Sequence, residues 1–310
     1  TKIGATADLL QSGAVIKPSF CGPCFGAGDV PAHNGLSLRH TTRNFPNREG
    51  SKPGEGQFAA VCLMDARSIA ATALHGGKIT PATEIDYTPL RHPYHFDKGV
   101  YDNRVYNGFG RPQPDTELIL GPNITDWPKM QPLAENLLVE LAAVLRDPVT
   151  TTDELIPSGE TSSYRSNPLR LAEFTLSRRE PAYVGRARAA AEMEAGRLAG
   201  RTPAKLQALL DRAGARAEET QFGSCVFANR PGDGSAREQA ASCQKVLGGF
   251  ANICYGFATK RYRSNCINWG ILPFTLDEEA AFPYAPGDCV FVPGIREAVR
   301  MGREDIPARV

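Results

Sequence analysis

Two cysteines separated by two residues form the first group that points to chemistry. Cys21 and Cys24 lie in the segment Phe-Cys-Gly-Pro-Cys-Phe-Gly at positions 20–26. Two thiolates at this spacing can share one metal ion or cluster, or form a redox disulfide. A zinc ion needs two further ligands, and the sequence contains no second pair of this kind. The spacing alone leaves an iron–sulfur cluster, a zinc ion, a redox pair and a structural loop open.

Two arginines form the second group. Arg43 and Arg48 lie in the polar stretch 39–50, which is bounded by glycine and proline. A guanidinium can bind a carboxylate through two parallel hydrogen bonds, so the pair fits a carboxylate clamp. Taken alone, a solvated loop with two surface arginines is the simpler explanation.

The third group is a glycine-rich loop that leads into a helix. Residues 229–241 read Asn-Arg-Pro-Gly-Asp-Gly-Ser-Ala-Arg-Glu-Gln-Ala-Ala, and we expect the helix to begin at Ser235. Backbone N–H groups at a helix N-terminus favour an anion, and Arg237 adds positive charge. Serine is also a favoured N-cap, so helix capping alone explains Ser235 equally well.

A fourth group lies near position 153. The stretch 151–159 begins Thr-Thr-Asp-Glu, and Arg165 follows it in the segment Tyr-Arg-Ser-Asn. Asp153 and Arg165 can serve catalysis, or they can form a turn and a surface ion pair. By itself this pattern is weak.

The elements that must position these groups alternate between helices and strands. Helices are predicted at 66–74, with Asp65 as N-cap and Gly76-Gly77 as the stop, and at 236–247, closed by two glycines. The stretch 185–215 is the clearest helical region, with Thr202-Pro203 opening its second part and Gly214 ending it. Strands are predicted at 225–227 and 289–292, while 137–145 fits a strand or a helix. The pattern indicates an α/β protein.

Length and composition narrow the class of protein. A chain of 310 residues with 42% hydrophobic residues predicts a globular protein of about two domains. Its net charge of +1 lacks the basic character of a nucleic-acid binder, so we expect no nucleic-acid partner. No apolar run reaches the ~20 residues that span a bilayer, so we expect no membrane association.

The remaining six of the eight cysteines indicate a reducing compartment. Several lie inside apolar runs, for example Cys62, Cys254 and Cys289, and fit small buried apolar residues better than disulfides. We therefore predict a cytoplasmic location.

Taken together and in this order, the four groups resemble motifs of the aconitase superfamily. Residues 21–26 resemble its cluster loop, and residues 43–48 resemble its Asn-Arg-Asn-Phe-x-Gly-Arg substrate loop. The Thr-Thr-Asp stretch ending at Asp153 resembles its Thr-Thr-Asp-His motif. Residues 234–241 are similar to its Gly-Ser-Ser-Arg-Glu-His-Ala-Ala turn, and 257–274 resemble its closing Phe-Ala…Asn…Gly-Leu-Leu-Pro-Leu segment. The resemblance covers most of the chain and also favours a strand at 137–145.

The resemblance implies a fold and a domain order. It implies an α/β protein in which a fragment of a three-layer α/β/α aconitase body domain is linked to a swivel domain of the β/β/α type. Residues 1–85 correspond to the C-terminal part of the third body domain with its cluster loop, 86–125 to the linker, and 126–310 to the swivel domain.

The resemblance also implies roles for individual residues. Cys21 and Cys24 would ligate a [4Fe–4S] cluster, and Arg43 and Arg48 would bind substrate carboxylates. Ser235 would be the base that takes the proton bound to carbon. Arg237 and Arg165 would hold carboxylates and activate that serine, and Asp153 would support proton transfer. The activity implied is a hydro-lyase acting on a hydroxy di- or tricarboxylic acid, with the open iron as Lewis acid.

Four departures from the motifs indicate a divergent, hydratase-like subgroup for which citrate is a doubtful substrate. Thr42 replaces Asn, Asn47 replaces Gly, Glu154 replaces His and Ala236 replaces the second Ser.

The resemblance further implies that residues upstream of Thr1 are needed. In the family a third cysteine ligand and histidine-based acid groups precede the cluster loop. We therefore expect the chain to be a fragment whose partner is the missing N-terminal portion of the same protein, with some C-terminal residues also absent. The fragment alone is expected to lack the cluster and to be inactive.

Two other readings compete with this one. The chain could be an unrelated zinc or redox protein built around Cys21 and Cys24, or an RNA-binding regulator with an aconitase-like fold. Metal analysis and a salt-dependent RNA shift assay separate these alternatives.

Overall fold

The computed structural model describes residues 3–17, 31–40, 56, 58–90, 93–157 and 159–310. The chain divides into two compact units, Thr1–Gln113 and Pro114–Val310. The boundary falls within the segment 86–125 expected as a linker, whereas the assignment of the parts to aconitase domains stays a prediction. Among the described residues, no helix combines the length and the apolar character that a bilayer crossing requires.

Among its described residues, the first unit contains a short parallel pair of strands and five small helical segments. Strands β1 (Gly35–Arg39) and β2 (Ala59–Leu63) pair in parallel. The helices are α1 (Ala5–Gln11), α2 (Ala66–Leu74) and α3 (Gly99–Asp102), with 3-10 turns at Ala82–Glu84 and Thr88–Leu90.

Helix α2 begins where the sequence predicted. The Asp65 side chain accepts hydrogen bonds from the backbone N–H groups of Arg67 (2.9 Å) and Ser68 (3.1 Å). These bonds satisfy donors that the first helical turn leaves open. Hydrogen bonds from the Ser68 hydroxyl and backbone lower the pKa of the Asp65 carboxyl.

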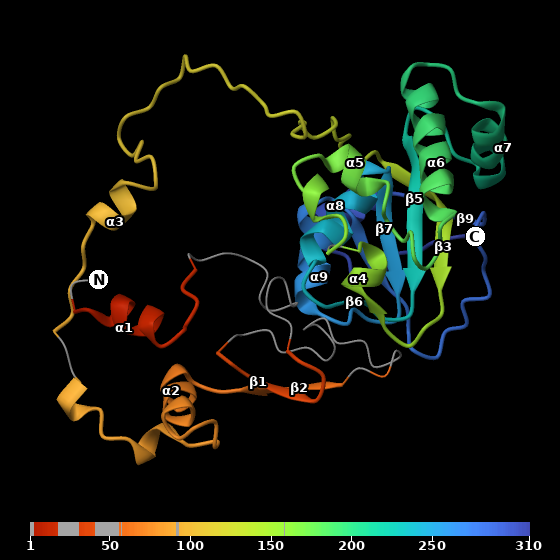
Figure 1. Cartoon of the computed structure of the whole chain (residues 1–310). Coiled ribbons are helices and arrows are strands. Elements are labelled where there is room, and N and C mark those ends of the chain that lie inside the picture. Colours follow the sequence, from red (N-terminus) through yellow and green to blue (C-terminus); the bar gives the residue numbers. More distant parts are fainter. Residues whose placement is uncertain (1–2, 18–30, 41–55, 57, 91–92, 158) are drawn as a thin grey trace. The chain divides into compact units, whose positions relative to one another are not determined.

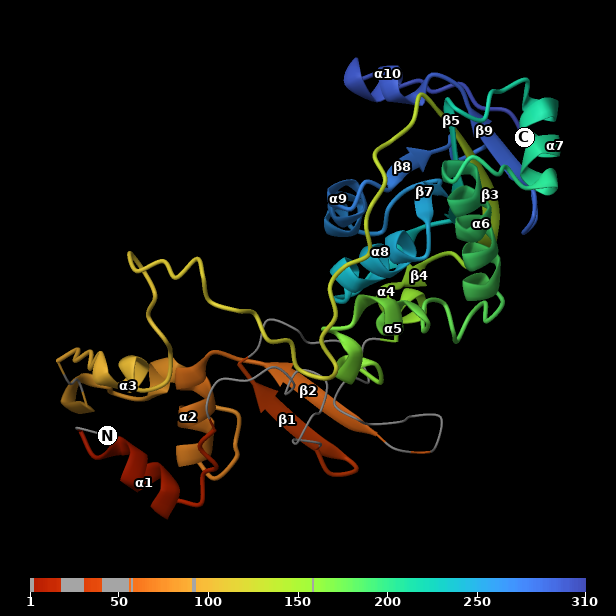
Figure 2. The same ribbon diagram turned by 90° about the horizontal axis from the view of Figure 1, so that it is seen from above.

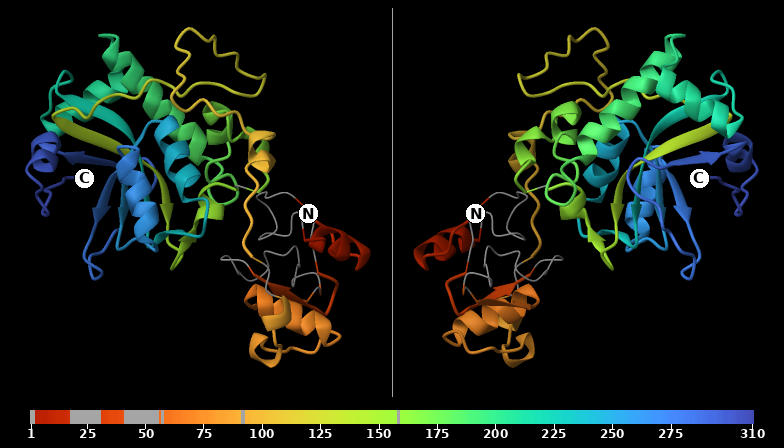
Figure 3. Two further views of the ribbon diagram at one scale, coloured as in Figure 1. Left: turned by 90° about the vertical axis from the view of Figure 1, so that its left-hand side faces the viewer. Right: turned by 90° about the vertical axis from the view of Figure 1, so that its right-hand side faces the viewer.

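The second unit is built on a five-stranded sheet with the order β8-β7-β5-β3-β9. Figure 1 shows its strands β7, β5 and β3 side by side. Strands β3 (Asn136–Leu145), β5 (Thr220–Ala228), β7 (Gly249–Cys254) and β8 (Leu272–Thr275) run parallel, and β9 (Cys289–Val292) is antiparallel at the edge. The sheet confirms the predicted α/β class, and the strand alternative for 137–145 is correct. Figure 3 shows in two opposite views how the strands fan out with the twist of the sheet.

The connections between the parallel strands are helical. They are α4 (Thr152–Leu155), α5 (Pro168–Ala172), α6 (Tyr183–Leu198), α7 (Ala204–Ala213), α8 (Arg237–Val246) and α9 (Lys260–Asn268), with a 3-10 turn at Ser162–Tyr164. Two-residue strand β4 (Thr150–Thr151) pairs in parallel with β6 (Pro231–Asp233). Pro203 is the N-cap of α7, one position later than expected, and Gly214 ends that helix in the left-handed conformation as predicted.

Alternating side chains give the sheet two apolar faces. On β5, Val226 and Ala228 belong to the core cluster that includes residues of α5, α6, α8 and α9. Cys225 and Phe227 belong to a second cluster that contains Ile295 and Ala298 of α10 (Ile295–Arg300). In Figure 2, strand β8 lies between α10 and α9. All nine residues of β5 are buried, as expected for a central strand of a parallel sheet.

Candidate active site

The loop that carries Ser235 depends on two glycines. Gly232 (φ +96°) and Gly234 (φ +121°) both adopt positive φ values. A Cβ on Gly232 would come within 2.3 Å of the Tyr262 ring, and one on Gly234 within 2.4 Å of Thr152 Oγ1. Only glycine combines this backbone conformation with such close neighbours, so the Gly-x-Gly spacing is a steric requirement of the loop.

Ser235 does not cap the helix that follows it. Helix α8 begins at Arg237, its N-cap is Ala236, and no N-cap side chain bonds the first turn. The prediction that the helix starts at Ser235 with its hydroxyl as the cap is therefore wrong. The reason lies in the loop, because the Ala236 N–H donates instead to Thr152 Oγ1 at 3.2 Å and fixes the entry to α8.

Ser235 and Arg237 line one hollow of about 340 Å³. The other residues around it are Glu238 of α8 and three residues of α9, namely Arg261, Ser264 and Asn265. The structure thus brings together two of the residues that the sequence singled out. Because β5 and β7 are parallel, the segments that follow them meet at the carboxyl edge of the sheet, which is the usual ligand-binding edge of α/β folds.

The charged groups of this hollow favour an anionic ligand. The Arg237 guanidinium donates to the carbonyl oxygen of Gly234. Glu238, the one carboxylate among the described lining residues, accepts hydrogen bonds from Trp269 Nε1 at 2.5 Å and from the side chain of Asn265, which also lines the hollow. Two guanidinium groups beside a helix N-terminus, with this carboxylate already hydrogen-bonded to neighbouring donors, suit a carboxylate or another anion.

Asp153 lies in the neighbouring short helix. It belongs to α4, directly after Thr152, whose hydroxyl accepts from the Ala236 N–H. Its Oδ2 accepts a hydrogen bond from Arg178 Nη1 at 3.0 Å, and its side chain is 51% exposed. Arg165 is exposed just after the 3-10 turn. Neither Asp153 nor Arg165 is among the described residues that line the hollow.

Glu154 occupies the position of a histidine in the family motif, and its side chain stabilises the start of helix α4. Its carboxylate accepts from the Thr151 backbone N–H at 2.7 Å, and the Thr151 hydroxyl accepts from the Glu154 N–H at 3.2 Å. This reciprocal capping box begins α4.

Four predicted site residues lie outside the described residues, namely Cys21, Cys24, Arg43 and Arg48. Within the part of the chain that the structure describes, no group of three or more His, Cys, Asp or Glu side chains could hold a metal ion.

Sequence reasoning missed the contribution of α9 to the hollow. Arg261 and Ser264 line it together with Asn265, which belongs to the stretch 257–274 that resembles the closing family segment. Thr259, the N-cap of α9, follows strand β7 closely, and this start signal at the carboxyl edge could have pointed to the first turns of the helix.

Four of the six cysteines outside the Cys21/Cys24 pair are buried, and Cys62 and Cys289 are half-buried. Burial raises the pKa of the Cys243, Cys254 and Cys266 thiols to about 12. These thiols therefore stay protonated at neutral pH and act as small apolar residues, as predicted.

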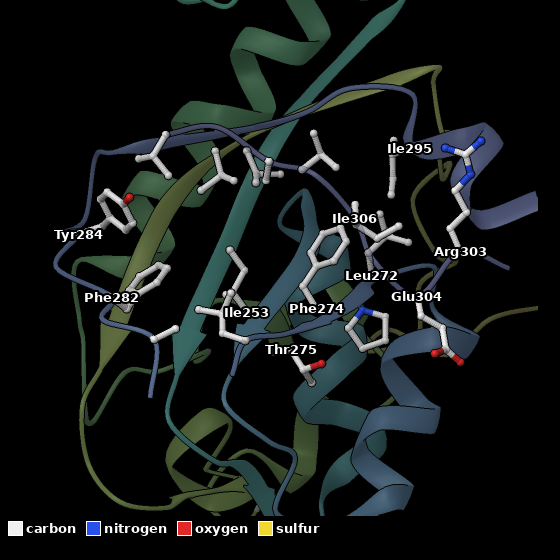
Figure 4. Close-up of a pocket in the computed structure, with 18 of the residues that line it drawn as sticks. Ile253, Leu272, Phe274, Thr275, Phe282, Tyr284, Ile295, Arg303, Glu304 and Ile306 are labelled. Atoms are coloured by element: carbon white, nitrogen blue, oxygen red, sulfur yellow. The ribbon is translucent and has the colours of Figure 1, made fainter. Parts of the chain in front are cut away.

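A second, larger hollow of about 720 Å³ is lined by residues of β8, β9 and α10 and by Arg263 of α9. Figure 4 shows apolar side chains such as Ile253, Phe274 and Phe282 around it, with Arg303 and Glu304 at one end. It contains none of the predicted site residues.

Two protein family models match parts of the chain, and both describe aconitases. The model of the aconitase family (aconitate hydratase) matches residues 1–76, and the model of the aconitase C-terminal domain matches residues 209–279. These matches support membership of the aconitase superfamily. The C-terminal aconitase match contains both Ser235 and Arg237, and the aconitase match at the start contains Cys21, Cys24, Arg43 and Arg48.

Individual aconitase relatives are distant. A putative mitochondrial aconitate hydratase of Emericella nidulans is 24% identical over 316 aligned positions, covering 94% of this chain and 38% of the relative. The mitochondrial homoaconitase of Debaryomyces hansenii is 36% identical over 89 positions, covering 28% of this chain and 12% of the relative. The large subunit of 3-isopropylmalate dehydratase from Nitratidesulfovibrio vulgaris is 30% identical over 79 positions, covering 25% and 19%.

The chain therefore spans about two fifths or less of these relatives. Two of the names include a mitochondrial location, so the cytoplasmic location of this aconitase relative stays a prediction. A solved 3-isopropylmalate dehydratase from Methanocaldococcus jannaschii has a TM-score of 0.32 and 20% identity, covering 56% of this chain and 81% of that one. A TM-score of this size is too low to establish a shared fold.

Proposed function

We propose that this chain is part of an aconitase-type hydro-lyase that removes and re-adds water at a hydroxy di- or tricarboxylic acid. The observation that carries the proposal is the hollow shared by Ser235, Arg237 and Arg261 at the carboxyl edge of the sheet. The family membership supplies the reaction class, and the cationic lining suits a substrate that bears several carboxylates.

In this proposal Ser235 takes the proton from carbon. A serine hydroxyl is a weak base in water, so its anion needs positive charge and N–H dipoles close by. Arg237 and the N-terminus of α8 stand in position to supply both, because Ser235 lies two residues before the first helical residue. Asp153 supports the proton transfer from the adjoining loop, and Arg165, Arg43 and Arg48 bind substrate carboxylates.

Cys21 and Cys24 would hold a [4Fe–4S] cluster together with a ligand from the rest of the enzyme. The donor set fits in part, because two thiolates at this spacing suit a cluster but do not complete a set of three ligands. When bound, the cluster supplies a Lewis acid for the substrate hydroxyl and carboxylate. We propose that the 310-residue chain by itself holds no intact cluster and is inactive.

The names of the relatives and the replaced motif residues bear on the identity of the substrate. The relatives are named for aconitate, homoaconitate and 3-isopropylmalate chemistry, and all three names describe hydroxy acids or their dehydration products. The replacements at Thr42, Asn47 and Ala236 argue for a substrate other than citrate.

The test is a dehydration assay on the enzyme completed with the N-terminal portion that its relatives possess and reconstituted anaerobically with iron and sulfide. A panel of hydroxy di- and tricarboxylic acids is followed by the absorbance of the enoate product. We expect turnover of at least one acid and a loss of about 10²-fold or more in kcat for Ser235→Ala. Ser264→Ala, which changes another hydroxyl in the same hollow, is the matched control and should keep activity within about threefold.

A parallel measurement addresses the 310-residue chain alone. Its anaerobic EPR spectrum after reconstitution should lack a stoichiometric [4Fe–4S] signal. One equivalent of zinc without iron would instead support the zinc alternative, and full dehydration activity of Ser235→Ala would refute the assigned base.

A further inference from the structure

Leu176, which has a strained backbone, lies just before two arginines, and one of them pairs with Asp153. Leu176 has φ +55°, although it is neither glycine nor asparagine, and its side chain is fully buried. This left-handed conformation costs about 1–2 kcal/mol. The Leu176 backbone N–H donates to the Leu155 carbonyl at 2.9 Å, so the strained residue is fastened to the end of α4.

Arg178 and Arg179 both form ion pairs with carboxylates of the segment that contains α4. Arg178 donates through Nη1 to Asp153 Oδ2 at 3.0 Å and through Nη2 to Glu160. Arg179 bonds Asp147, and its Nε lies 3.4 Å from Glu154 Oε1. Asp147 and Glu154 raise the pKa of Arg179, and Arg179 lowers the pKa of Asp147.

Stability does not explain the Arg178–Asp153 pair. The two side chains are 46% and 51% exposed, and ion pairs this exposed contribute about 0–1 kcal/mol. The pair nevertheless fixes the orientation of the Asp153 carboxylate, because the Arg178 guanidinium is also hydrogen-bonded to Glu160. Within the described part of the chain, Asp153 Oδ1 forms no hydrogen bond, whereas Oδ2 is held.

We infer that Arg178 is a positioning residue for Asp153. It holds Oδ2 and leaves Oδ1 available to accept or return a proton next to the Ser235 loop, to which α4 is joined by the Thr152–Ala236 hydrogen bond. The inference rests on the proposed function, because it assumes that Asp153 takes part in proton transfer.

The experiment compares Arg178→Gln, Arg178→Lys and Arg188→Gln in the completed enzyme. Arg188 is the matched control because its pair with Glu173 has the same length, 3.0 Å, and a similar exposure, 50% and 36%. Arg178→Gln should lower kcat about 10-fold or more with KM changed less than about threefold, because a displaced catalytic group costs rate rather than ground-state binding. Arg178→Lys should recover part of kcat, and Arg188→Gln should match the parent.

A second readout needs no activity. Urea unfolding should place Arg178→Gln within about 1 kcal/mol of the parent.

The possible results distinguish the positioning role of Arg178 from the proton-transfer role of Asp153. Parental kcat of Arg178→Gln together with an inactive Asp153→Asn overturns the inference and leaves the proposed role of Asp153 intact. Parental activity of Asp153→Asn overturns the proposed role of Asp153 and the inference with it. An Arg178→Lys variant as slow as Arg178→Gln also counts against positioning by charge.

Discussion

The Thr152 hydroxyl accepts a hydrogen bond from the Ala236 backbone N–H at 3.2 Å, across 84 residues of sequence. Each partner is the direct neighbour of a residue proposed for catalysis, Asp153 on one loop and Ser235 on the other. The bond thus ties together the two loops that follow β3 and β5, and changes at this contact should disturb both.

Gly234→Ala tests the contact sterically. The new Cβ would lie 2.4 Å from Thr152 Oγ1, and turning Thr152 away would break its bond to Ala236. Positive φ and overpacking together should cost about 2–4 kcal/mol of unfolding free energy, measured by urea denaturation. The control is Gly287→Ala, which has φ +102° but no atom within 4 Å of the Cβ, so it should lose only about 1 kcal/mol. Equal losses in the two variants would show that the contact with Thr152 is unimportant.

Ser235→Ala should cost less stability than Thr259→Ala. Thr259 is the true N-cap of α9, accepting from the Tyr262 N–H at 3.2 Å and donating to the Gly232 carbonyl at 2.9 Å. Loss of such a cap costs about 1–2 kcal/mol, whereas Ser235 lies outside the cap of α8. Chemical denaturation of the two variants measures the difference, and a larger loss for Ser235→Ala would restore the capping interpretation.

Gln244→Leu should remove the centre of a buried polar network. Gln244 Nε2 donates to Tyr262 Oη and to the Ala240 carbonyl, each at 2.8 Å, and Gln244 Oε1 accepts from Asn252 Nδ2 at 3.2 Å. Because Asn252 Oδ1 already has no hydrogen-bond partner among the described residues, the change leaves further buried groups unsatisfied and should cost about 2–4 kcal/mol. Gln207→Leu on the exposed face of α7 is the control, expected within about 0.5 kcal/mol. A stability loss no greater than the control's would rule out a cooperative network.

Lys245 should make stability rise between pH 8 and 10.5. Burial lowers the pKa of its ammonium from 10.5 to about 8, although Nζ donates to the Gly270 carbonyl at 3.0 Å and lies 4.1 Å from the centre of the Phe250 ring. Above pH 8 the folded chain loses this proton while the unfolded chain keeps it up to pH 10.5. The unfolded state then binds more protons, so the free energy of unfolding increases with pH, and below pH 8 the full burial cost remains.

The measurement compares the parent with Lys245→Met by urea denaturation at several pH values. The parent should gain up to about 3 kcal/mol relative to the variant between pH 8 and 10.5. A difference between the two proteins that is independent of pH would mean that Lys245 keeps its ordinary pKa.

The local elements of this protein follow from its sequence. Asp65 and the glycines after residue 75 bound α2, the apolar run at 137–145 forms β3, and Gly214 ends α7. These features depend on neighbours within a few residues, so capping and periodicity are sufficient to predict them. The family motifs likewise placed Ser235 and Arg237 in one site, and the structure brings them to one hollow.

Only the tertiary structure decided what each loop residue contacts. The Thr152 hydroxyl accepts a hydrogen bond from the Ala236 N–H, so Ser235 is not the N-cap of α8. Arg261 of α9 lines the same hollow as Ser235. Leu176 adopts a left-handed conformation, and Arg178, two residues later, pairs with Asp153. These relations join residues from 25 to 84 positions apart through hydrogen bonds at the carboxyl edge of a parallel sheet. Such pairings arise when the strands align, and no local propensity specifies them.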